Sequence, residues 1–185
     1  MSVGFSADTH EGELYQHQSE WTFFVWLCAP FSALRKFGLC RLAASLGGLF
    51  PMQCLKEKVA ITFPQNAFES NTDEVTGVEK AVYQTLENID ALLENSSDPS
   101  QWDKEKWDYF RGLVYRQILD SKCIMSKPKA AQDFPSREAA LKGYFDTVSS
   151  TLKEKDFSYC AWEIVRNEIL RTLKFILDHN SDIMS

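Results

Sequence analysis

The sequence predicts an all-α fold of about five helices. Apolar residues recur at three- to four-residue spacing in five segments between residues 34 and 180, which is the period of an amphipathic helix. No two neighbouring stretches alternate between apolar and polar residues in the manner of paired strands. A long connection, residues 49–77, separates the first two helical segments. Together these observations indicate one helical domain, which also suits a chain of 185 residues.

Residues 1–33 differ from the rest of the chain. The first twenty residues contain four acids and no Lys or Arg, so we expect a solvated tail there. Residues 21–33 form an apolar run with the length of a signal-peptide core, too short for an ordinary membrane span. The first basic residues, Arg35 and Lys36, follow this run, which reverses the charge order that favours secretion. We therefore expect an atypical leader or a poorly ordered segment, followed by a folded domain over residues 34–185.

The first helix is predicted to begin near residue 34 and to end at Gly47-Gly48, which Pro51 follows. Its apolar residues are Leu34, Phe37, Leu39, Leu42, Ala43 and Leu46. The connection after it shows no sustained period, so we expect a long loop, with or without a short strand-like or helical piece. Loops of this length often carry function.

Four further helices are predicted. The second ends before the turn-forming residues 95–100, and its apolar face consists of Val78, Ala81, Val82, Leu86, Ile89, Leu92 and Leu93. The third covers residues 103–124, with the apolar residues Trp107, Phe110, Leu113, Val114, Ile118 and Cys123. Residues 126–135 contain two prolines and predict a loop. The fourth has Ser136 as its N-cap and the apolar face Ala140, Tyr144, Val148 and Leu152. The last has the apolar face Trp162, Val165, Ile169, Leu173 and Ile176, so Trp162 is expected in the core.

These helices must bury their apolar faces against one another. The long first connection can span the length of a bundle, which allows the first two main helices to run parallel. The expected order is therefore up-up-down-down, the topology of helical cytokine bundles. On physical grounds alone, an intracellular helical adaptor or a ligand-binding bundle fits equally well.

Composition and motifs argue against several classes of function. The net charge of -6 and the pI near 5.1 give no positive field for phosphate backbones, so we expect no nucleic-acid binding. The three histidines lie near the chain ends, and the sequence contains no zinc-protease, nucleotide-binding or esterase motif. We also find no pair of acids placed for acid–base catalysis. The expectation is a protein that is not an enzyme and that uses no cofactor or metal.

The five cysteines are widely spread and form no CxxC pair. They are Cys28, Cys40, Cys54, Cys123 and Cys160. Their spacing alone is compatible with buried thiols in a reducing compartment and with long-range disulfides in an oxidising one. Asn95 begins the only N-glycosylation tripeptide of the chain, in a turn-forming stretch where an exported chain is open to glycosylation.

Two motifs closely resemble type I interferons. Residues 152–171 (LKEKDFSYCAWEIVRNEILR) resemble the last helix of the family, which opens with Cys-Ala-Trp-Glu followed by a hydrophobic residue, Val and Arg. Residues 50–64 (FPMQCLKEKVAITFP) resemble its first long loop, in which Cys-Leu-Lys precedes Phe-Pro by about ten residues. Gly47-Gly48 and a four-cysteine layout are most similar to the interferons of bony fishes. The resemblance covers roughly residues 34–178.

The resemblance implies a disulfide between Cys54 and Cys160. The second bridge of the family joins an N-terminal cysteine to one near the end of the third helix, which Cys123 matches. Cys28 is the expected partner, because it precedes Cys54 by 26 residues, close to the family spacing. Cys40 would otherwise pack as a core thiol, and it replaces Cys28 if cleavage after Ala29 or Ala33 removes the leader.

The resemblance implies receptor binding without catalysis. An antiviral cytokine of this family is secreted, acts as a monomer without a membrane span, and engages two different chains of a class II cytokine receptor to trigger JAK-STAT signalling. The residues that match the receptor patch are Leu55, Lys58, Arg166 and Arg171. Leu55 would be an apolar anchor, and the two arginines would bind carboxylates of the receptor. An intracellular splice form or another helical adaptor remains the alternative if the apolar run is not a working signal, and a bundle enzyme with an unrecognised site is a third possibility.

Overall fold

The structure is a computed structural model that describes residues 38–69, 75–94, 96, 98–99, 101–126 and 134–180. In these ranges the regular secondary structure is helical and contains no strand. The α-helices are α3 (Leu39–Gly47), α4 (Val75–Glu94), α5 (Lys104–Ser121), α6 (Phe134–Glu154) and α7 (Tyr159–His179). Short 3-10 helices are η1 (Met52–Glu57), η2 (Gln65–Ala67) and η3 (Lys122–Ser126). The all-α prediction is confirmed.

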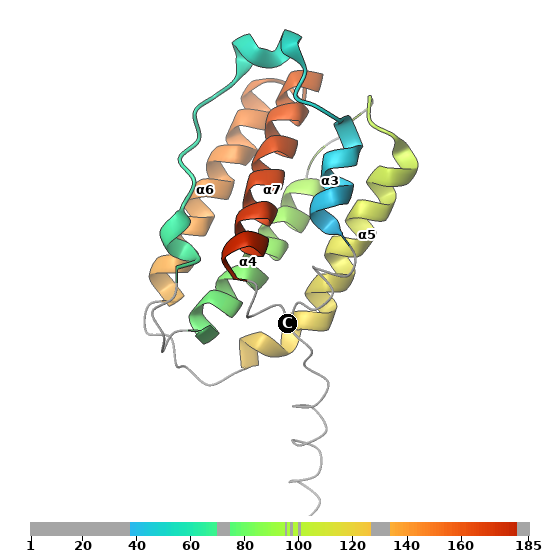
Figure 1. Cartoon of the computed structure of the whole chain (residues 1–185). Helices are drawn as coiled ribbons and strands as arrows, with labels where there is room; N and C mark the ends of the chain where they lie inside the picture. The colour runs from blue at the N-terminus through green and yellow to red at the C-terminus, as the bar shows by residue number, and fades with distance from the viewer. Residues whose placement is uncertain are drawn as a thin grey trace, which may run out of the picture.

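The helices adopt the predicted order. In Figure 1, α3 and α4 run in one direction, and α5 and α7 run in the opposite direction. The long first connection makes this possible, because it leads the chain from the end of α3 along α7 and α6 before α4 begins. The remaining helix, α6, is the fourth along the chain and runs parallel to α4 and antiparallel to α7.

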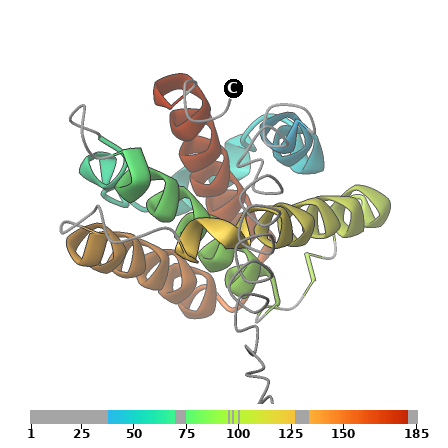
Figure 2. The ribbon, with the colours of Figure 1, turned by 90° about the horizontal axis from the view of Figure 1, so that it is seen from below.

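The central helix of the bundle is α4, which packs against both α5 and α6 (Figure 2). Every residue of its predicted apolar face is buried, as are further residues around its circumference. The first two turns of α7 are also buried on all sides, from Cys160 to Arg166, whereas its second half is buried along one face. The stripe of α7 is the predicted one: Trp162, Val165, Ile169, Leu173 and Ile176 are all buried.

The ends of three helices show how local sequence determines the boundaries. Asp103 caps α5, since its side chain accepts from the backbone N–H of Lys106 at 3.1 Å. Ser158 caps α7 in the same way, by accepting from the N–H of Ala161 at 3.2 Å. The predicted N-cap of α6 at Ser136 is wrong, because the helix already begins at Phe134. Pro135 fits in this first turn, where a backbone N–H would have no acceptor within the helix.

The core face of α6 also differs in detail from the prediction. Ala140 is only half-buried, and the buried apolar residues are Leu141, Tyr144, Phe145, Val148 and Leu152. At the other end of the bundle, Trp162 is confirmed as a core residue. Its ring packs edge-on against those of Trp102 and Trp107, with centroid distances of 5.5 and 5.6 Å.

Several predictions concern residues outside the described ranges. These are the leader over residues 1–33, Cys28, the first turn of the first helix, and the glycosylation position Asn95. The described helices include none long and apolar enough to cross a membrane.

Candidate functional site

The first connection is attached to α7 by a disulfide. Cys54 in η1 is bonded to Cys160 in the first turn of α7, which joins residues 106 positions apart at a Cα–Cα distance of 5.2 Å. This is the pairing that the resemblance implies. Both cysteines are buried, so the bond fixes η1 at one end of the last helix.

The other two described cysteines differ in state. Cys123 is also disulfide-bonded, and its expected partner, Cys28, lies outside the described residues. Cys40 is a free, half-buried thiol on α3. Burial raises the pKa of the Cys40 thiol, with Lys174 opposing and Asp178 supporting the shift. Cys40 is thus not bonded to Cys123 in the full chain, and the alternative pairing applies to a chain that has lost Cys28.

The residues around Cys54 expose a group of large apolar side chains. Leu49 is 95% exposed, Met52 is 80% exposed and Leu55 is 47% exposed, and Val59 is also exposed. We call these four residues the loop surface. The sequence analysis named Leu55 but missed the other three. Apolar residues in a segment without helical period could have indicated that they are exposed. Four such side chains within eleven positions are unusual for a solvated loop, and exposed apolar patches mark interaction sites.

Lys58, another predicted site residue, is exposed beside the loop surface. Its Nζ lies 5.9 Å from the centroid of the Phe50 ring. Nearby, Lys155 from the turn after α6 forms an ion pair with Glu57 at 3.4 Å. The pair of Lys155 and Glu57 is neutral, so it is Lys58 that places positive charge beside the loop surface.

Arg166 lies inside the bundle, so its predicted place on a receptor-facing surface is corrected. It is 2% exposed. Its Nη2 and Nε donate to Oε2 of Glu163 at 2.6 and 3.1 Å, and its Nη1 donates to the carbonyl oxygen of Ala44 at 3.4 Å. The other oxygen of Glu163 accepts from the indole N–H of Trp102 at 2.8 Å. This network joins α7 to α3 and to the segment before α5.

Arg171 lies at the edge of the first connection. Its side chain is 40% exposed and forms an ion pair with Glu168. Its Nη2 donates to the carbonyl oxygen of Ile61 at 3.0 Å, and its guanidinium lies 5.1 Å from the centroid of the Phe63 ring. Arg171 therefore holds the connection against α7 while part of its side chain remains accessible. Leu55, Lys58 and Arg171 lie on or near the connection, but Arg166 does not join them.

The ion pair of Arg171 continues into a buried polar network. The hydroxyl of Tyr144 on α6 donates to Oε2 of Glu168 at 2.8 Å and lies 3.2 Å from the Thr172 hydroxyl. Burial, together with the negative charge of Glu168, raises the pKa of Tyr144 above its usual value. The phenol therefore stays protonated and links α6 to α7 by a hydrogen bond.

A second exposed apolar group lies on α5. Tyr109, Tyr115 and Leu119 are each more than half exposed. On the same side of the helix, a Cβ at Gly112 would meet no atom within 4 Å. We call Tyr109, Gly112, Tyr115 and Leu119 the α5 surface. Sequence reasoning missed it, because it considered only the buried stripe of this helix.

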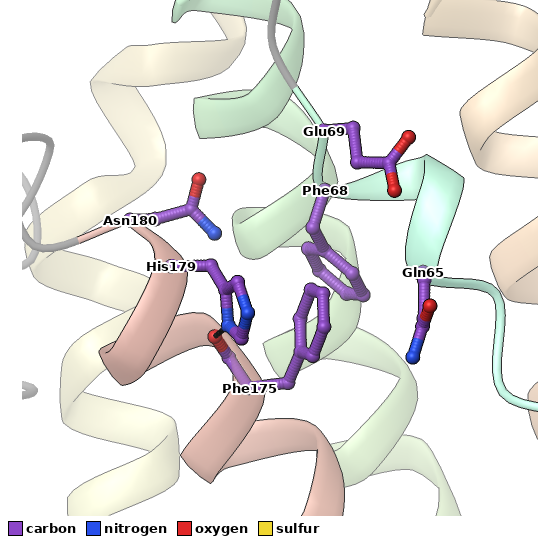
Figure 3. A pocket seen from close by; sticks show the side chains of 6 residues that line it. All are labelled: Gln65, Phe68, Glu69, Phe175, His179 and Asn180. Carbon is purple, nitrogen blue, oxygen red and sulfur yellow. Dashed lines mark hydrogen bonds between the residues drawn. The ribbon is translucent and has the colours of Figure 1, made fainter.

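A pocket of about 330 Å³ lies between η2 and the end of α7 (Figure 3). Its lining residues are Gln65, Phe68, Glu69, Phe175, His179 and Asn180. The His179 ring stacks on that of Phe175 at a centroid distance of 4.0 Å. Among the described residues, no group of three His, Cys, Asp or Glu side chains is placed to hold a metal ion.

The fold and these surfaces together define a class of protein. A bundle of five described helices with a long, disulfide-anchored first connection has the helical cytokine fold. Residues 37–181 match the interferon alpha/beta domain family. The chain therefore belongs to the type I interferon family.

Individual relatives agree with this assignment. The chain is 29% identical to interferon alpha-1 of Equus caballus over 135 residues, which cover 71% of this chain and 73% of that protein. It is 25% identical to interferon alpha-7 of Homo sapiens over 138 residues, which cover 72% and 73%. The structure matches zebrafish interferon 2 with a TM-score of 0.73 and 45% identity, covering 78% of this chain and 95% of that one. Zebrafish interferon 1 matches with a TM-score of 0.63 and 23% identity, over 80% and 92%, and supports the fold. Interferons are cytokines of innate immunity and are not enzymes.

Proposed function

We propose that this chain is a secreted, monomeric antiviral cytokine that binds two different chains of a class II cytokine receptor. Bringing the two receptor chains together activates their associated kinases, which triggers JAK-STAT signalling and antiviral gene expression. The observation that carries this proposal is the exposure of four large apolar side chains on a connection that a disulfide anchors. Interferon membership supports receptor binding in general, and these surfaces supply the particular residues.

The loop surface is the proposed site for one receptor chain. Met52 and Leu55 supply apolar area that a partner removes from water, and buried anchors of this kind dominate interface energies. Lys58 and the accessible part of Arg171 add positive charge beside it. We therefore expect the matching receptor surface to combine an apolar pocket with carboxylates at its rim.

The α5 surface is the proposed site for the other receptor chain. Tyr109 and Tyr115 are of a residue type enriched at protein interfaces, because a tyrosine offers a large apolar ring and a polar tip. Gly112 leaves space between them in which a partner side chain can approach the helix backbone. Two separate apolar surfaces on one bundle favour two receptor chains over one.

Reciprocal substitutions test the two sites. We expect L55A and M52A to weaken binding to one receptor chain by about 5- to 100-fold, as for interface hot spots. The same variants should bind the other chain normally. L119A and Y115A should show the opposite selectivity, so each pair is the control for the other. Titration of both receptor chains on a sensor surface measures this. If all four variants bind both chains like the wild type, the assigned surfaces are wrong.

Export is tested with the complete chain. We propose that residues 1–33 are a leader that is separate from the domain over residues 34–185. Medium from transfected fish cells should then activate receptor-dependent kinase signalling in fresh cells and protect them from virus. Inactive medium together with an active cell lysate would instead indicate an intracellular form. We consider this form because the basic residues follow the apolar run of residues 21–33, whereas a signal peptide has them before it. If the medium, the lysate and refolded residues 34–185 all fail to activate signalling, the cytokine assignment is contradicted.

Asn95 is a proposed glycosylation position of the exported protein. The tripeptide Asn95-Ser96-Ser97 follows the last turn of α4. Treatment of the secreted chain with a glycosidase that removes N-linked sugars should lower its apparent mass. The variant N95Q should already migrate at the lower mass, and an unchanged mass for the treated wild type would contradict this assignment.

A further inference from the structure

The second half of the first connection, residues 61–69, is held by two arginines from neighbouring helices. Arg171 of α7 donates to the carbonyl oxygen of Ile61 at 3.0 Å. Arg137 of α6 donates from Nη1 to the carbonyl oxygens of Ala67 and Glu69 at 2.9 and 2.6 Å. Arg137 is 6% exposed, so these bonds are shielded from water. The connection is therefore attached at three places, of which the disulfide is the first.

Aromatic packing lies between the two arginine contacts. The Phe63 ring has centroid distances of 5.1 Å to Phe175, 5.6 Å to Tyr144 and 5.8 Å to Phe68. Arg171 covers one side of this ring. The segment is thus seated on α6 and α7 by ring contacts as well as by hydrogen bonds, and a displacement of its end at η2 would disturb Phe68 and then Phe63.

The exposed part of the connection between the first two attachments is short. Cys160 and Arg171 are eleven residues apart on α7, which corresponds to about 16 Å along the helix. The seven steps from Cys54 to Ile61 span at most about 25 Å when fully extended. Three of those steps lie in η1, where each rises only about 2 Å. Leu55 and Val59 therefore lie on a segment of eight residues that is attached to α7 at both ends.

At the end of the connection, the carbonyl oxygens of Ala67 and Glu69 both accept from one side chain, that of Arg137. η2 is only three residues long, so it provides few internal hydrogen bonds for the carbonyls around it. Nη1 of Arg137 serves two of these carbonyls at once, because this nitrogen carries two N–H groups. On the other side of η2, Gln65, Phe68 and Glu69 line the pocket of about 330 Å³ (Figure 3), so this segment has space to move when the contact is lost.

We propose that Arg137 is a positioning residue for the loop surface. By fixing Ala67 and Glu69 on α6, it keeps residues 61–69 seated, and the segment from Cys54 to Ile61 stays in its binding arrangement before a partner arrives. A preformed surface avoids the entropy cost of ordering the loop during association. This inference rests on the proposed function, because it assigns Arg137 to the receptor site at the loop surface without direct contact.

Three variants of the full chain test the inference. Arg137→Met removes the donors and keeps an unbranched apolar stem, and Arg137→Lys keeps the charge but replaces the guanidinium by an ammonium on a shorter side chain. Lys142→Met is the matched control on the same helix, since Lys142 is exposed and pairs with Asp146 at 2.6 Å. The first readout is hydrogen exchange without receptor at Gln65, Ala67 and Phe68, whose amides donate within the connection. The second is the binding kinetics of each receptor chain.

We expect Arg137→Met to accelerate hydrogen exchange at these amides by about tenfold or more. The amides of α5 should keep their exchange rates, because only the connection opens locally. Its affinity for the chain that recognises the loop surface should fall by about 3- to 10-fold, mainly through slower association. Its affinity for the chain that recognises the α5 surface should not change. Arg137→Lys should lie between this variant and the wild type, and Lys142→Met should leave both the exchange and the loop-surface affinity unchanged.

The outcomes separate this inference from the proposed function. Unchanged exchange in Arg137→Met overturns the positioning role, whatever the receptor does. Faster exchange with unchanged affinity for both chains also overturns it, because the contact would then hold the loop without serving binding. Equal loss of affinity for both chains, with faster exchange throughout α5, indicates general destabilisation and likewise overturns it. If the wild type binds neither receptor chain, the proposed function fails, and the role assigned to Arg137 fails with it.

Discussion

Gly47 is a residue where a single methyl group matters. A Cβ at this position would lie 2.7 Å from Nε of Arg166 and would also collide with the carboxylate of Glu163. Both groups are buried and bonded to each other, so they cannot move away freely. We expect Gly47→Ala to destabilise the fold by about 1–2 kcal/mol, because overpacking costs more than the helix gains from alanine. Chemical denaturation measures the change.

Gly143 supplies the control for Gly47. It lies in the interior of α6, and a Cβ there would meet no atom within 4 Å. Gly143→Ala should therefore stabilise the fold by about 0.5–1 kcal/mol through reduced freedom of the unfolded chain. Stabilisation by both substitutions would show that the buried ion pair has room to adjust.

The buried pair of Glu163 and Arg166 should show strong coupling. Arg166→Met leaves a buried carboxylate without its partner, which costs about 3–5 kcal/mol. Adding Glu163→Gln removes that charge and keeps an acceptor for Trp102, so the double variant should be more stable than Arg166→Met alone. Arg116→Met is the control, since its side chain is exposed and its pair with Asp120 is 3.8 Å long. Strictly additive effects in denaturant titrations would contradict the network.

Arg166 also shows which site features a sequence can supply. Its motif predicts the last helix correctly, and Trp162 in the same motif is in the core as expected. The motif does not reveal that Arg166 points between α7 and α3, because its burial depends on Ala44 and Trp102, which are distant in sequence. Leu55 could be predicted as exposed because its surroundings in the chain already indicate a loop.

At the scale of helices, α4 contains an unfavourable charge. Burial raises the pKa of the Asp90 carboxyl, and the negative charges of Glu94 and Glu87 support this while Arg111 opposes it. The folded chain therefore binds this proton more tightly than the unfolded chain. At a pH above the raised pKa, the ionised Asp90 carboxylate therefore lowers the free energy of unfolding. This cost disappears below the ordinary pKa near 3.8, where the carboxyl is protonated in both the folded and the unfolded chain.

Asp90→Asn should remove this cost. We expect it to stabilise the chain by about 0.5 kcal/mol at pH 7, as for relief of like charges three and four residues apart. The gain should shrink as the pH falls through the raised pKa. Denaturant titrations at pH 7 and at acidic pH measure it, with Asp146→Asn on α6 as the control, because that change removes an ion pair. A gain that grows toward acidic pH would contradict the assigned sign.

Helix periodicity predicted the elements well because each helix has an apolar face that recurs with the helical period, even where α4 and α7 bury further residues. Boundaries were harder wherever two local signals compete. Ser136 has the chemistry of an N-cap, yet Pro135 is also suited to the first turn, and the helix begins before both. A short helical piece in the long connection was among the expectations. The positions of η1 and η2 could not be predicted, because they depend on Cys160 and Arg137 in other helices.

For the whole molecule, the bond between Cys54 and Cys160 should dominate stability. It closes a loop of 106 residues, which corresponds to about 4–5 kcal/mol in the chain-entropy account. The double variant C54S/C160S should therefore melt about 10–20 °C lower, at the usual ratio for a domain of this size. Cys40→Ser is the control because Cys40 is a free thiol, and it should shift the melting temperature much less. Equal shifts would contradict the dominant role of this bond.

The pairing of the remaining cysteines determines how the N-terminal segment relates to the bundle. Cys123 is disulfide-bonded at the end of the third predicted helix, and Cys40 is free, which leaves Cys28 as the partner that we propose. Alkylation of the unreduced, denatured full chain should then modify Cys40 alone. Non-reducing digestion should yield one cross-linked peptide with Cys54 and Cys160, and another with Cys28 and Cys123. Removal of the leader after Ala29 or Ala33 would also remove Cys28. The same digestion of the secreted form, together with identification of its N-terminal residue, shows whether Cys40 pairs with Cys123 in that case. An alkylated Cys123 in the full chain would overturn the proposed pairing.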